Sequence, residues 1–470
     1  MTSENEKVSR RDWLKFVGGT VVGLVVGGVL GYFGGAAKPA EKTVTVEKTK
    51  TIVSTVTSVS PTTITTTTAP PPTPTTVRIF RPGTVEKVRK WMEDAVKEFE
   101  KKYPNINVEP VYCGWGEYST KIRSLVASGQ APDVAMIWIG DVYYYADQDA
   151  LIPLDQYFDV EELKKSYPTL NACFWKGTLY GIPASVGNFV FFYHKKVFEK
   201  AGLDPEKPPR TWDEMVDYAR QIQENTDSYG IGIPGDAITA KDVFTIHWYT
   251  LTKVKPEYDP ETKTVYWDSS EGRKVLKFLY DLVNTWKVTQ PDPLSYSRFD
   301  LRPLFRDGKI AMHFDGPWIL PMLKEAFDFS DPEKCPIGIT RIPSVDEKSY
   351  PYSASQSGCD QWVIFKQTKD LDAALELLKF VTSPEWQYKH DVIYGQIPAR
   401  VEEYEEQEFK QWYYEPFKEM LKNSGPPQPV MIEMTEYQRL MCEMLQKIYA
   451  CEMEIEDAIK AYAEKIKKLR

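Results

Sequence analysis

A stretch of threonine and proline, residues 60–76 with the sequence SPTTITTTTAPPPTPTT, divides the chain into two unequal parts. It carries no charge, and Ile64 is its only aliphatic side chain larger than alanine. Such a segment buries too little apolar surface to offset the roughly 1–2 kcal/mol per residue that ordering a backbone costs. Its five prolines favour the extended polyproline II conformation. We therefore expect a spacer, with any large folded part beyond it.

The segment before the spacer has the order of an export signal. Residues 9–15, SRRDWLK, resemble the twin-arginine export motif, with Trp13 where phenylalanine is usual. An uncharged run over residues 16–37 follows, and its eight glycines argue against a buried core helix. The basic residues that precede this run are Lys7, Arg10, Arg11 and Lys15.

The fate of this signal has two possible outcomes. About 20 apolar residues suffice to span a bilayer, whereas GGAA at residues 34–37 offers small residues to a signal peptidase. A lipid anchor is not expected, because the first cysteine is Cys113. A stalk is useful only if its front end is held, so we expect residues 1–37 to anchor the protein and residues 38–77 to form a disordered stalk. The module over residues 78–470 would then be held at the extracellular face of the membrane.

Composition bounds what this module can be. About 390 residues are enough for one large or two medium domains. A net charge of −9 and a pI near 5.3, with no basic run outside the signal, argue against nucleic acid as a partner. The four histidines are dispersed and the cysteines show no Cys-x-x-Cys spacing, so neither a metal site nor a cofactor is expected. Scarce asparagine with plentiful glutamate and lysine suggests a thermophile.

The six cysteines leave disulfide pairing open. Outside the cell one or two disulfides could form. Cys442 and Cys451 are nearest in sequence, but continuous helix would hold them on opposite faces, so this pair would need a break in the chain. The full set is Cys113, Cys173, Cys335, Cys359, Cys442 and Cys451.

The first part of the module alternates strand and helix patterns, which predicts an α/β architecture. The expected strands are 76–80, 106–112 and 132–138, and the expected helices are 86–104 and 118–129. Further on, residues 211–226 predict a helix capped by Thr211, with Glu214 completing a capping box.

Motifs of nucleotide binding and catalysis are either decoys or missing. Residues 230–235, GIGIPG, satisfy G-x-G-x-x-G, but a predicted helix precedes them and Pro234 lacks an N–H for phosphate, so a strand and turn are expected. The sequence has no G-x-S-x-G, H-E-x-x-H or P-loop motif. The acidic runs at 401–409 and 452–460 predict solvated helix faces. We expect no enzymatic activity, although paired glycosidase carboxylates are not recognisable from sequence.

Six segments in a fixed order carry a family resemblance. They are FEKKYPNINV (99–108), ASGQAPDVAMIW (127–138), YGIPASVGNFVFFYHKKVFEKAGLD (180–204), FRDGKIAMHFDGPW (305–318), SGCDQWVIFK (357–366) and GQIPAR (395–400). Together they resemble the extracellular solute-binding proteins of ABC importers, in the family that includes maltose-binding and related sugar-binding proteins. His194 stands where this family usually has asparagine. A twin-arginine signal followed by a Thr/Pro stalk is similar to tethered archaeal receptors of this type.

The resemblance implies a periplasmic-binding-protein-like α/β fold with two lobes and a ligand cleft between them. Lobe one would comprise about 78–183 and 345–397, and lobe two about 184–344 and 398–470. The implied function is capture of a sugar or oligosaccharide by hinge closure, followed by delivery to an ABC permease in the membrane, without breaking any bond. A monomer is expected.

Sugar recognition needs aromatic platforms for the C–H faces and carboxylate or amide acceptors for the hydroxyls. Trp138 and Asp141 lie at the carboxyl end of the strand AMIW, where α/β proteins bind ligands. By resemblance, Asp315 and Trp318 correspond to the Gly-Pro-Trp platform of the second lobe. For each tryptophan the competing interpretation is core packing. The candidate ligand-binding residues are Trp115, Glu117, Trp138, Asp141, Trp248, Asp315, Trp318 and Tyr437.

Three alternatives remain open at this point. The same fold could bind a glycerol phosphate, a polyamine or a peptide; a phosphate would require arginine, and none is evident beside the candidate aromatic residues, which favours a neutral sugar. A secreted, stalked glycoside hydrolase is a second alternative. A twin-arginine-exported redox enzyme is a third, and the few cysteines and histidines argue against it. Neither the ligand's identity and length nor the permease partner follows from the sequence.

Overall fold

The computed structural model describes residues 74–83, 86–426 and 429–469. Strand β1, Thr75–Pro82, pairs with β2 along its whole length, so the last three residues of the expected stalk belong to the folded part. The predicted signal and the rest of the stalk lie outside the described residues. Within the described ranges, no helix is long and apolar enough to cross a membrane.

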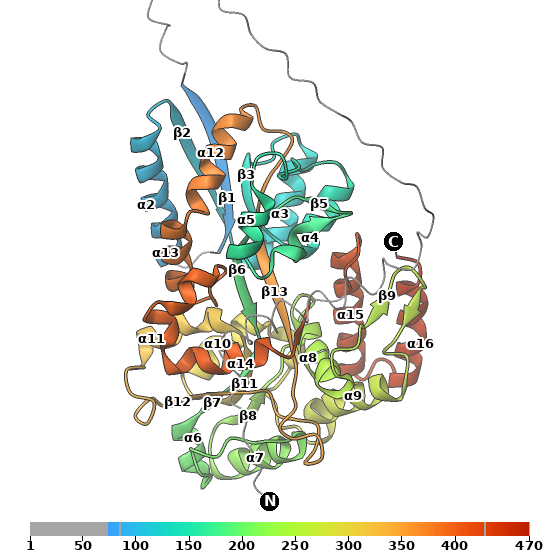
Figure 1. The fold of residues 1–470 in the computed structure, drawn as a ribbon. Helices are drawn as coiled ribbons and strands as arrows, with labels where there is room; N and C mark the ends of the chain where they lie inside the picture. The colour runs from blue at the N-terminus through green and yellow to red at the C-terminus, as the bar shows by residue number, and fades with distance from the viewer. Residues whose placement is uncertain (1–73, 84–85, 427–428, 470) are drawn as a thin grey trace, which may run out of the picture. The chain divides into compact units, whose positions relative to one another are not determined.

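The first sheet is mixed and has the strand order β14-β13-β3-β1-β2, with β6 also paired to β13 (Figure 1). Strand β1 runs parallel to both β2 and β3, whereas β13 runs antiparallel to β3 and to β6. The predicted strands over 76–80, 106–112 and 132–138 are confirmed within a few residues. The remaining strands are β2 (Ile106–Cys113), β3 (Val134–Trp138), β6 (Ile182–Asn188), β13 (Ser355–Ile364) and β14 (Ser424–Gly425).

The second sheet has the order β12-β7-β11-β8. Strand β8, Tyr229–Gly232, contains the start of the GIGIPG segment and follows a helix, which confirms the prediction of a strand and turn. Strand β7 is antiparallel to β11 and β12. The other three strands are β7 (Val190–His194), β11 (Ile310–Asp315) and β12 (Ile337–Thr340), and two small hairpins pair β4 (Phe174–Trp175) with β5 (Thr178–Leu179) and β9 (Tyr258–Asp259) with β10 (Thr264–Val265).

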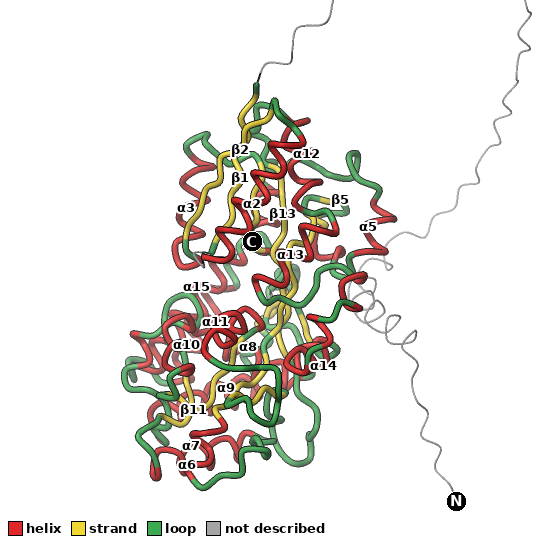
Figure 2. Tube along the Cα trace, turned by 90° about the vertical axis from the view of Figure 1, so that its left-hand side faces the viewer, coloured by secondary structure: helices red, strands yellow, loops and turns green. Residues whose placement is uncertain are grey.

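Helices cover both sheets (Figures 1 and 2). Helices α2 and α12 pack on the first sheet, and α7 and α10 pack on the second, at the opposite end of the view in Figure 2. The α-helices are α2 (Glu86–Lys102), α3 (Trp115–Ala127), α4 (Ile139–Asp147), α5 (Val160–Ser166), α6 (Lys195–Ala201), α7 (Trp212–Asn225), α8 (Ala240–Thr252), α9 (Ser270–Tyr280), α10 (Arg298–Arg306), α11 (Leu320–Ala326), α12 (Leu371–Val381), α13 (Pro384–Tyr394), α14 (Glu415–Leu421), α15 (Met434–Tyr449) and α16 (Ile455–Ile466). The short 3₁₀ segments are η1 (Leu170–Cys173), η3 (Pro293–Ser295), η4 (Pro317–Ile319), η5 (Val401–Glu405), η6 (Glu408–Lys410) and η7 (Trp412–Tyr414), and η2 (Asp281–Thr285) is a π-helical turn.

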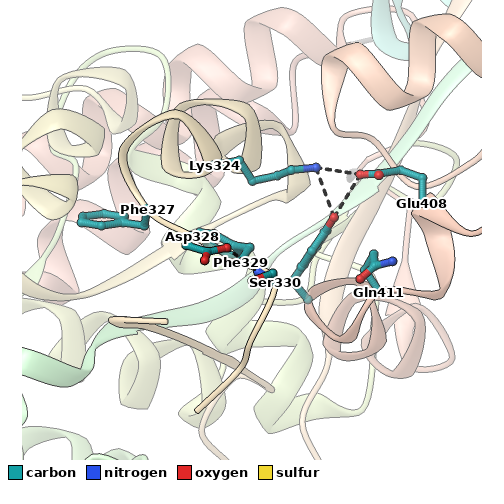
Figure 3. Close-up of a pocket in the computed structure, with 8 residues that line it drawn as sticks. Lys324, Phe327, Asp328, Phe329, Ser330, Glu408 and Gln411 are labelled. Atoms are coloured by element: carbon teal, nitrogen blue, oxygen red, sulfur yellow. Dashed lines mark hydrogen bonds and ion pairs between the residues drawn. The ribbon is translucent and has the colours of Figure 1, made fainter. Parts of the chain in front are cut away.

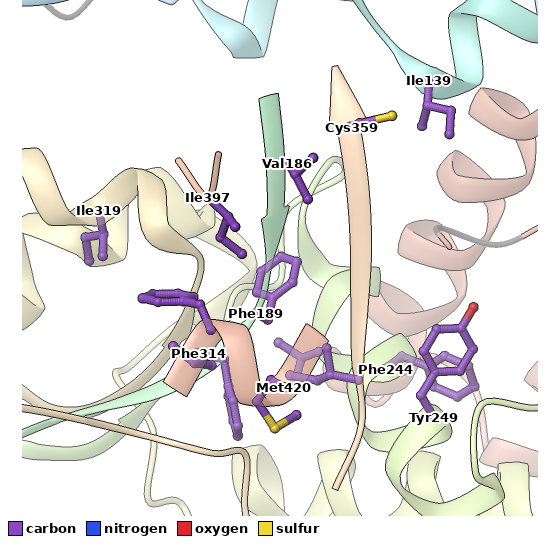
Figure 4. Close-up of a cluster of buried hydrophobic side chains, with 14 of the residues drawn as sticks. Ile139, Val186, Phe189, Phe244, Tyr249, Phe314, Ile319, Cys359, Ile397 and Met420 are labelled. Atoms are coloured by element: carbon purple, nitrogen blue, oxygen red, sulfur yellow. The ribbon is translucent and has the colours of Figure 1, made fainter. Parts of the chain in front are cut away.

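The two sheets are joined where β6 passes into β7. Only Phe189 separates the two strands, so the chain leaves the first sheet after Asn188. The Ser355 hydroxyl at the start of β13 accepts the Phe189 N–H and donates to the Phe189 carbonyl, both at 2.8 Å, which ties β13 to this crossing. The side chains of Val186, Phe189 and Ile397 belong to the buried core here (Figure 4).

The capping of α7 and the exposure of the acidic run differ in part from the predictions. Thr211 caps α7 by accepting the Glu214 N–H at 3.2 Å, but the Glu214 carboxylate accepts from the Arg210 N–H instead of closing the box on Thr211. The run 401–409 is not a solvated helix face throughout, because Glu403 in η5 is only 4% exposed. Burial and the nearby Asp391 charge raise the pKa of Glu403 to about 10.

The cysteines are free thiols. Cys442 is buried within α15, whereas Cys451 follows the end of that helix and is exposed. The helix ends at Tyr449, between the two cysteines, but their sulfur atoms do not form a disulfide.

Candidate functional site

Asp141 and Trp138 lie at the carboxyl end of β3, as predicted. Trp138 ends the strand and is half-buried, and its main-chain N–H donates to the Tyr118 hydroxyl at 3.1 Å. Asp141 lies in the first turn of α4 and is fully buried. Its carboxylate accepts from the Thr435 hydroxyl of α15 at 3.4 Å, and Arg123 lies 3.8 Å away. Burial raises the pKa of Asp141, against the opposing effects of the Tyr118 hydroxyl and Arg123.

Trp115 and Glu117 lie in the first turn of α3, which follows β2. The half-buried Trp115 indole donates a hydrogen bond to the Tyr394 hydroxyl at 3.0 Å. Glu117 is exposed, so its carboxylate remains hydrated. Of these two residues, only Trp115 contacts Tyr394.

Trp248 and Tyr437 are core residues in this structure. Both side chains are fully buried. The Trp248 indole donates to the Lys255 carbonyl at 2.7 Å. The Tyr437 hydroxyl donates to Glu257 at 2.8 Å and accepts from the Trp267 indole at 3.1 Å. The partners of Tyr437 are buried, whereas Lys255 is exposed, and none of these partners is another predicted site residue.

Asp315 and Trp318 lie together at the end of β11, with two arginines from α10. The Trp318 indole N–H donates to the Asp315 carboxylate. The same carboxylate accepts from Arg298 Nη1 at 3.0 Å and from Arg302 Nε at 2.7 Å and Nη2 at 3.1 Å. The Gly316 N–H adds a further donor at 2.8 Å. We call Arg298, Arg302, Asp315 and Trp318 the β11 cluster.

The charge state of Asp315 follows from these contacts. Burial by itself would raise its pKa, but Arg302 and Arg298 outweigh burial and hold the pKa well below the usual range. Its carboxylate accepts five hydrogen bonds, four at Oδ1 and one, from Arg302, at Oδ2. Asp315 therefore orients Trp318 and pairs with the two arginines; its role as a ligand-binding residue stays a prediction.

The sequence-based expectation that no arginine lies beside the candidate aromatic residues is wrong. The Arg298 guanidinium carbon lies 5.0 Å from the Trp318 ring centroid and 5.0 Å from that of Phe189. Its charge is paired with Asp315 and, at 3.6 Å, with Asp242. The contact could not be predicted from the FDGPW motif, because Arg298 lies on α10, well before Trp318 in the chain.

Trp318 is half-buried against the crossing strand β6. Its ring meets Phe189 edge-on, with centroids 5.5 Å apart and an interplanar angle of 82°. A Cβ placed on Gly187 would lie 2.6 Å from a carbon of the Trp318 ring and 2.8 Å from Oε1 of Gln396. Only glycine at position 187 leaves room for these two side chains.

A second buried group lies at the end of β1 in the first sheet. Arg81 is fully buried, donates to His390 Nε2 at 2.9 Å, and lies 4.5 Å from the Tyr394 ring centroid. Asp360 on β13 pairs in register with Trp138 and accepts from Ser185 at 3.2 Å. Burial raises the pKa of Asp360 to about 7, although the Arg81 charge opposes this.

Tyr394 lies in contact with Arg81 and Trp115 and within electrostatic range of Arg302. Burial raises its pKa, and both Arg81 and Arg302 act against that rise through their charges. Arg302 belongs to the β11 cluster, whereas Arg81 belongs to the first sheet. Trp115, Tyr394 and Arg81 thus form one contact group at the end of β1, and Trp318 with Asp315 and Arg298 forms another at the end of β11.

Sequence reasoning missed Arg81, Arg298, Arg302 and Tyr394. Arg81 could have been found by applying to β1 the same strand-end rule that found Trp138. Arg298 and Arg302 are four residues apart and thus share a face of α10, which is a detectable spacing. Tyr394 immediately precedes the GQIPAR segment, but nothing in its local pattern marks it as a partner of Trp115.

A surface cavity of about 350 Å³ lies elsewhere in the structure, between α11 and the 3₁₀ turns η6 and η7 (Figure 3). Its polar groups bind one another: Lys324 lies 2.7 Å from Glu408 and donates to Tyr413 at 3.1 Å, and Tyr413 donates to Glu408 at 3.0 Å. It contains none of the predicted site residues. Across the described ranges, no group of three or more His, Cys, Asp or Glu side chains is arranged to hold a metal ion.

The chemistry of the crossing region suits a ring-shaped polar molecule. A half-buried indole offers a face for C–H groups, and the surrounding charged and amide side chains offer hydrogen-bond donors and acceptors for hydroxyls. The fully buried carboxylate beside the indole, Asp315, is paired with Arg298 and Arg302.

Comparison with known proteins identifies relatives of this chain and its fold. Residues 94–413 match the family model described as bacterial extracellular solute-binding protein. A binding protein of Brucella abortus is 25% identical over 319 residues, which cover 67% of this chain and 74% of that protein. The maltotriose-binding protein of Pyrococcus abyssi is 25% identical over 315 residues, which cover 65% of this chain and 62% of that protein.

Among solved structures, an ABC transporter solute-binding protein from Thermotoga lettingae, bound with α-D-tagatose, superposes with a TM-score of 0.73. It is 26% identical to this chain, and the match covers 84% of this chain and 99% of that one. The likeness therefore extends over both sheets.

Proposed function

The chain belongs to the bacterial extracellular solute-binding protein family, and on that premise we propose that it captures a sugar or oligosaccharide for an ABC importer. Its fold is the α/β periplasmic-binding-protein fold, as the sequence predicted. Members of this family bind solutes and are not enzymes, so the hydrolase and redox alternatives are set aside. Proteins of known ligand among its relatives include one that binds maltotriose and one solved with tagatose.

The observation that carries the proposal is the position of Trp318. Its ring is half-buried at the junction of the two sheets, and Asp315, Arg298 and Phe189 hold its orientation. A ring held in place before the ligand arrives loses little conformational entropy on binding. Such a platform suits the apolar face of a sugar.

We propose closure about the crossing strands as the binding mechanism. The first lobe would consist of the first sheet and its helices, and the second lobe of the second sheet with α15 and α16. The Asp141–Thr435 contact joins α4 of one lobe to α15 of the other and supports a closed arrangement. Ligand contacts from both lobes would stabilise this state, which a permease could then recognise.

A neutral sugar is favoured because the arginines near Trp318 are paired with Asp315 and Asp242. A sugar phosphate or glycerol phosphate is the second candidate. It is supported by the partial exposure of Arg298 and Arg302, at 12% and 16% of their side chains.

Native mass spectrometry of the purified protein for a copurified ligand tests the proposal directly. Calorimetric titration with maltotriose, D-tagatose and sn-glycerol 3-phosphate then separates the two candidates. Tight binding of a neutral sugar is expected. Binding of the phosphate alone would replace the proposed ligand class, and binding of none would leave peptides or polyamines to be tried.

For the N-terminal segment we propose a membrane tether at the extracellular face, made of the twin-arginine signal and the Thr/Pro stalk. The motif over residues 9–15 and the composition of residues 38–74 support it. We expect a monomer that starts at or near Met1 and partitions with membranes. N-terminal sequencing that found a start near Lys38, with protein in the medium, would contradict the tether. A melting temperature far above the roughly 45–65 °C of mesophile domains would support a thermophilic source.

A further inference from the structure

Three buried glutamines have a side-chain oxygen without a hydrogen-bond partner, and one of them differs from the other two. Gln361 Nε2 donates to the Ala172 carbonyl at 2.9 Å, and Gln387 Nε2 donates to the Ala184 carbonyl at 2.6 Å. These two amides are thus anchored to the main chain. Within the described part of the chain, the Gln396 side chain makes no hydrogen bond, although only 2% of the residue is exposed.

The main chain around Gln396 is fixed. Its N–H donates to the Asp391 carbonyl at 3.1 Å, and the next N–H, that of Ile397, donates to the Val186 carbonyl of β6 at 3.0 Å (Figure 4). Gly395 before it caps α13 with φ of 76°, a conformation that favours glycine. The free amide is therefore held in place by its backbone and is not the end of a loose loop.

The amide lies beside the aromatic platform. Gln396 Oε1 and the six-membered ring of Trp318 both approach the same point above Gly187, at 2.8 and 2.6 Å from where a Cβ would lie. Burying an amide without a partner is costly, and native proteins rarely leave one so. We therefore expect a hydrogen-bond partner for the Gln396 amide, supplied by a bound molecule, at the edge of the Trp318 ring.

We propose that Gln396 is a ligand-contacting, specificity-determining residue, whose amide hydrogen-bonds a hydroxyl of the sugar ring that lies against Trp318. This inference rests on the proposed function. A hydroxyl both donates and accepts, and so does an amide, which makes them matched partners. A site built around such a bond strongly rejects an analogue that lacks the hydroxyl, because the buried amide is then left unpaired.

Gln396→Met tests this, because methionine keeps the length and shape of the side chain and removes both polar atoms. The wild-type protein is first titrated with maltose, maltotriose and D-tagatose, and the tightest of these is used throughout. We expect Gln396→Met to weaken its binding about 10-fold or more, with the melting temperature of the unliganded protein unchanged or raised. The matched control is Gln361→Met, which should lower the melting temperature and leave the affinity of the folded protein unchanged.

Deoxy analogues of the same sugar make the test specific. One deoxy position should weaken wild-type binding but leave Gln396→Met binding unaffected, since the partner amide is already gone. Wild-type affinity in Gln396→Met would overturn the inference while leaving sugar binding intact. Failure of the wild-type protein to bind any of the three sugars would overturn the proposed function and this inference together.

Discussion

The Trp318 indole donates its hydrogen bond to Asp315, three residues earlier, and that carboxylate also binds Arg298 and Arg302. One buried carboxylate thus sets the orientation of the ring and neutralises the guanidinium groups beside it. The aromatic platform is therefore supported by an ion cluster rather than by apolar packing alone.

Replacing Asp315 should expose this dependence. Asp315→Asn leaves two largely buried arginines without their main counter-ion, and removing one partner of a buried ion pair costs about 3–5 kcal/mol. We expect the free energy of unfolding to fall by about that amount and the affinity for ligand to fall with it, because Trp318 loses its acceptor. Urea unfolding at pH 7 and titration measure the two effects. Unchanged stability would mean that Asp242 alone balances the arginines.

Trp318→Ala should mainly affect binding. Stacking contributes about 0.5–1.5 kcal/mol beyond area burial, and the lost burial adds to it, so we expect affinity to weaken about 10-fold or more. Because the ring also contacts Phe189, a smaller loss of stability is expected. The control is Trp248→Ala, at a fully buried ring, which should cost about 3–5 kcal/mol of stability. If Trp318→Ala behaved like this control and kept its affinity, Trp318 would be a core residue.

Gly187→Ala should disturb the site from the backbone side. The added methyl would lie 2.6 Å from the Trp318 ring and 2.8 Å from Gln396 Oε1, closer than van der Waals contact allows. We expect both a lower melting temperature and a loss of ligand affinity, since the indole must shift. Gly177→Ala is the control for affinity: its φ of 83° strains alanine and should lower the melting temperature, but nothing lies within 4 Å of a Cβ there, so affinity should be unchanged. Normal affinity in Gly187→Ala would show that the ring is free to move.

Asp360 should make stability fall as pH rises. Burial raises its pKa from 3.8 to about 7, so between these values the folded state holds a proton that the unfolded state has released. The free energy of unfolding therefore decreases as pH increases through this window, by at most about 4 kcal/mol. Asp360→Asn should remove this contribution. The stability of the variant minus that of the wild type should therefore be larger at pH 8 than at pH 5. Urea unfolding at the two pH values measures this. An equal change in the free energy of unfolding between pH 5 and pH 8 in both proteins would contradict the prediction.

The stalk should matter for transport and not for binding. About 40 residues of polyproline II could extend on the order of 120 Å. Deleting residues 60–74, which end before β1, should leave ligand affinity unchanged and impair uptake by cells. Lost affinity would indicate that this segment contacts the module, and normal uptake would indicate that reach is not its role.

The α/β alternation was predictable because each early element has a simple period. The strand over 132–138 is apolar on both faces, as befits a strand buried within a sheet, and the amphipathic helix over 86–104 is observed as α2. Trp138, Asp141, Asp315 and Trp318 were located by position after a strand or by motif. Their placement needed no knowledge of contacts.

The partners of these residues were not predictable, because long-range contacts create them. Arg298 reaches Trp318 only through the packing of α10 on β11, and Tyr394 meets Trp115 across 279 residues of sequence. Trp248 and Tyr437 were proposed for their residue type, but aromatic residues are equally suited to cores. Glu403 lies in an acidic run that looks solvated, and only tertiary packing buries it.

Strand β13 has a consequence for the order in which this protein can be made. It pairs with both β3 and β6, yet it is residues 355–364 of the chain and follows every strand of the second sheet. During synthesis the first three strands must wait, with one edge of β3 unpaired, until β13 at residues 355–364 has left the ribosome. Pairing over such long sequence separations is slow, and exposed edges invite aggregation. Completion of the first sheet therefore depends on the late synthesis and pairing of β13.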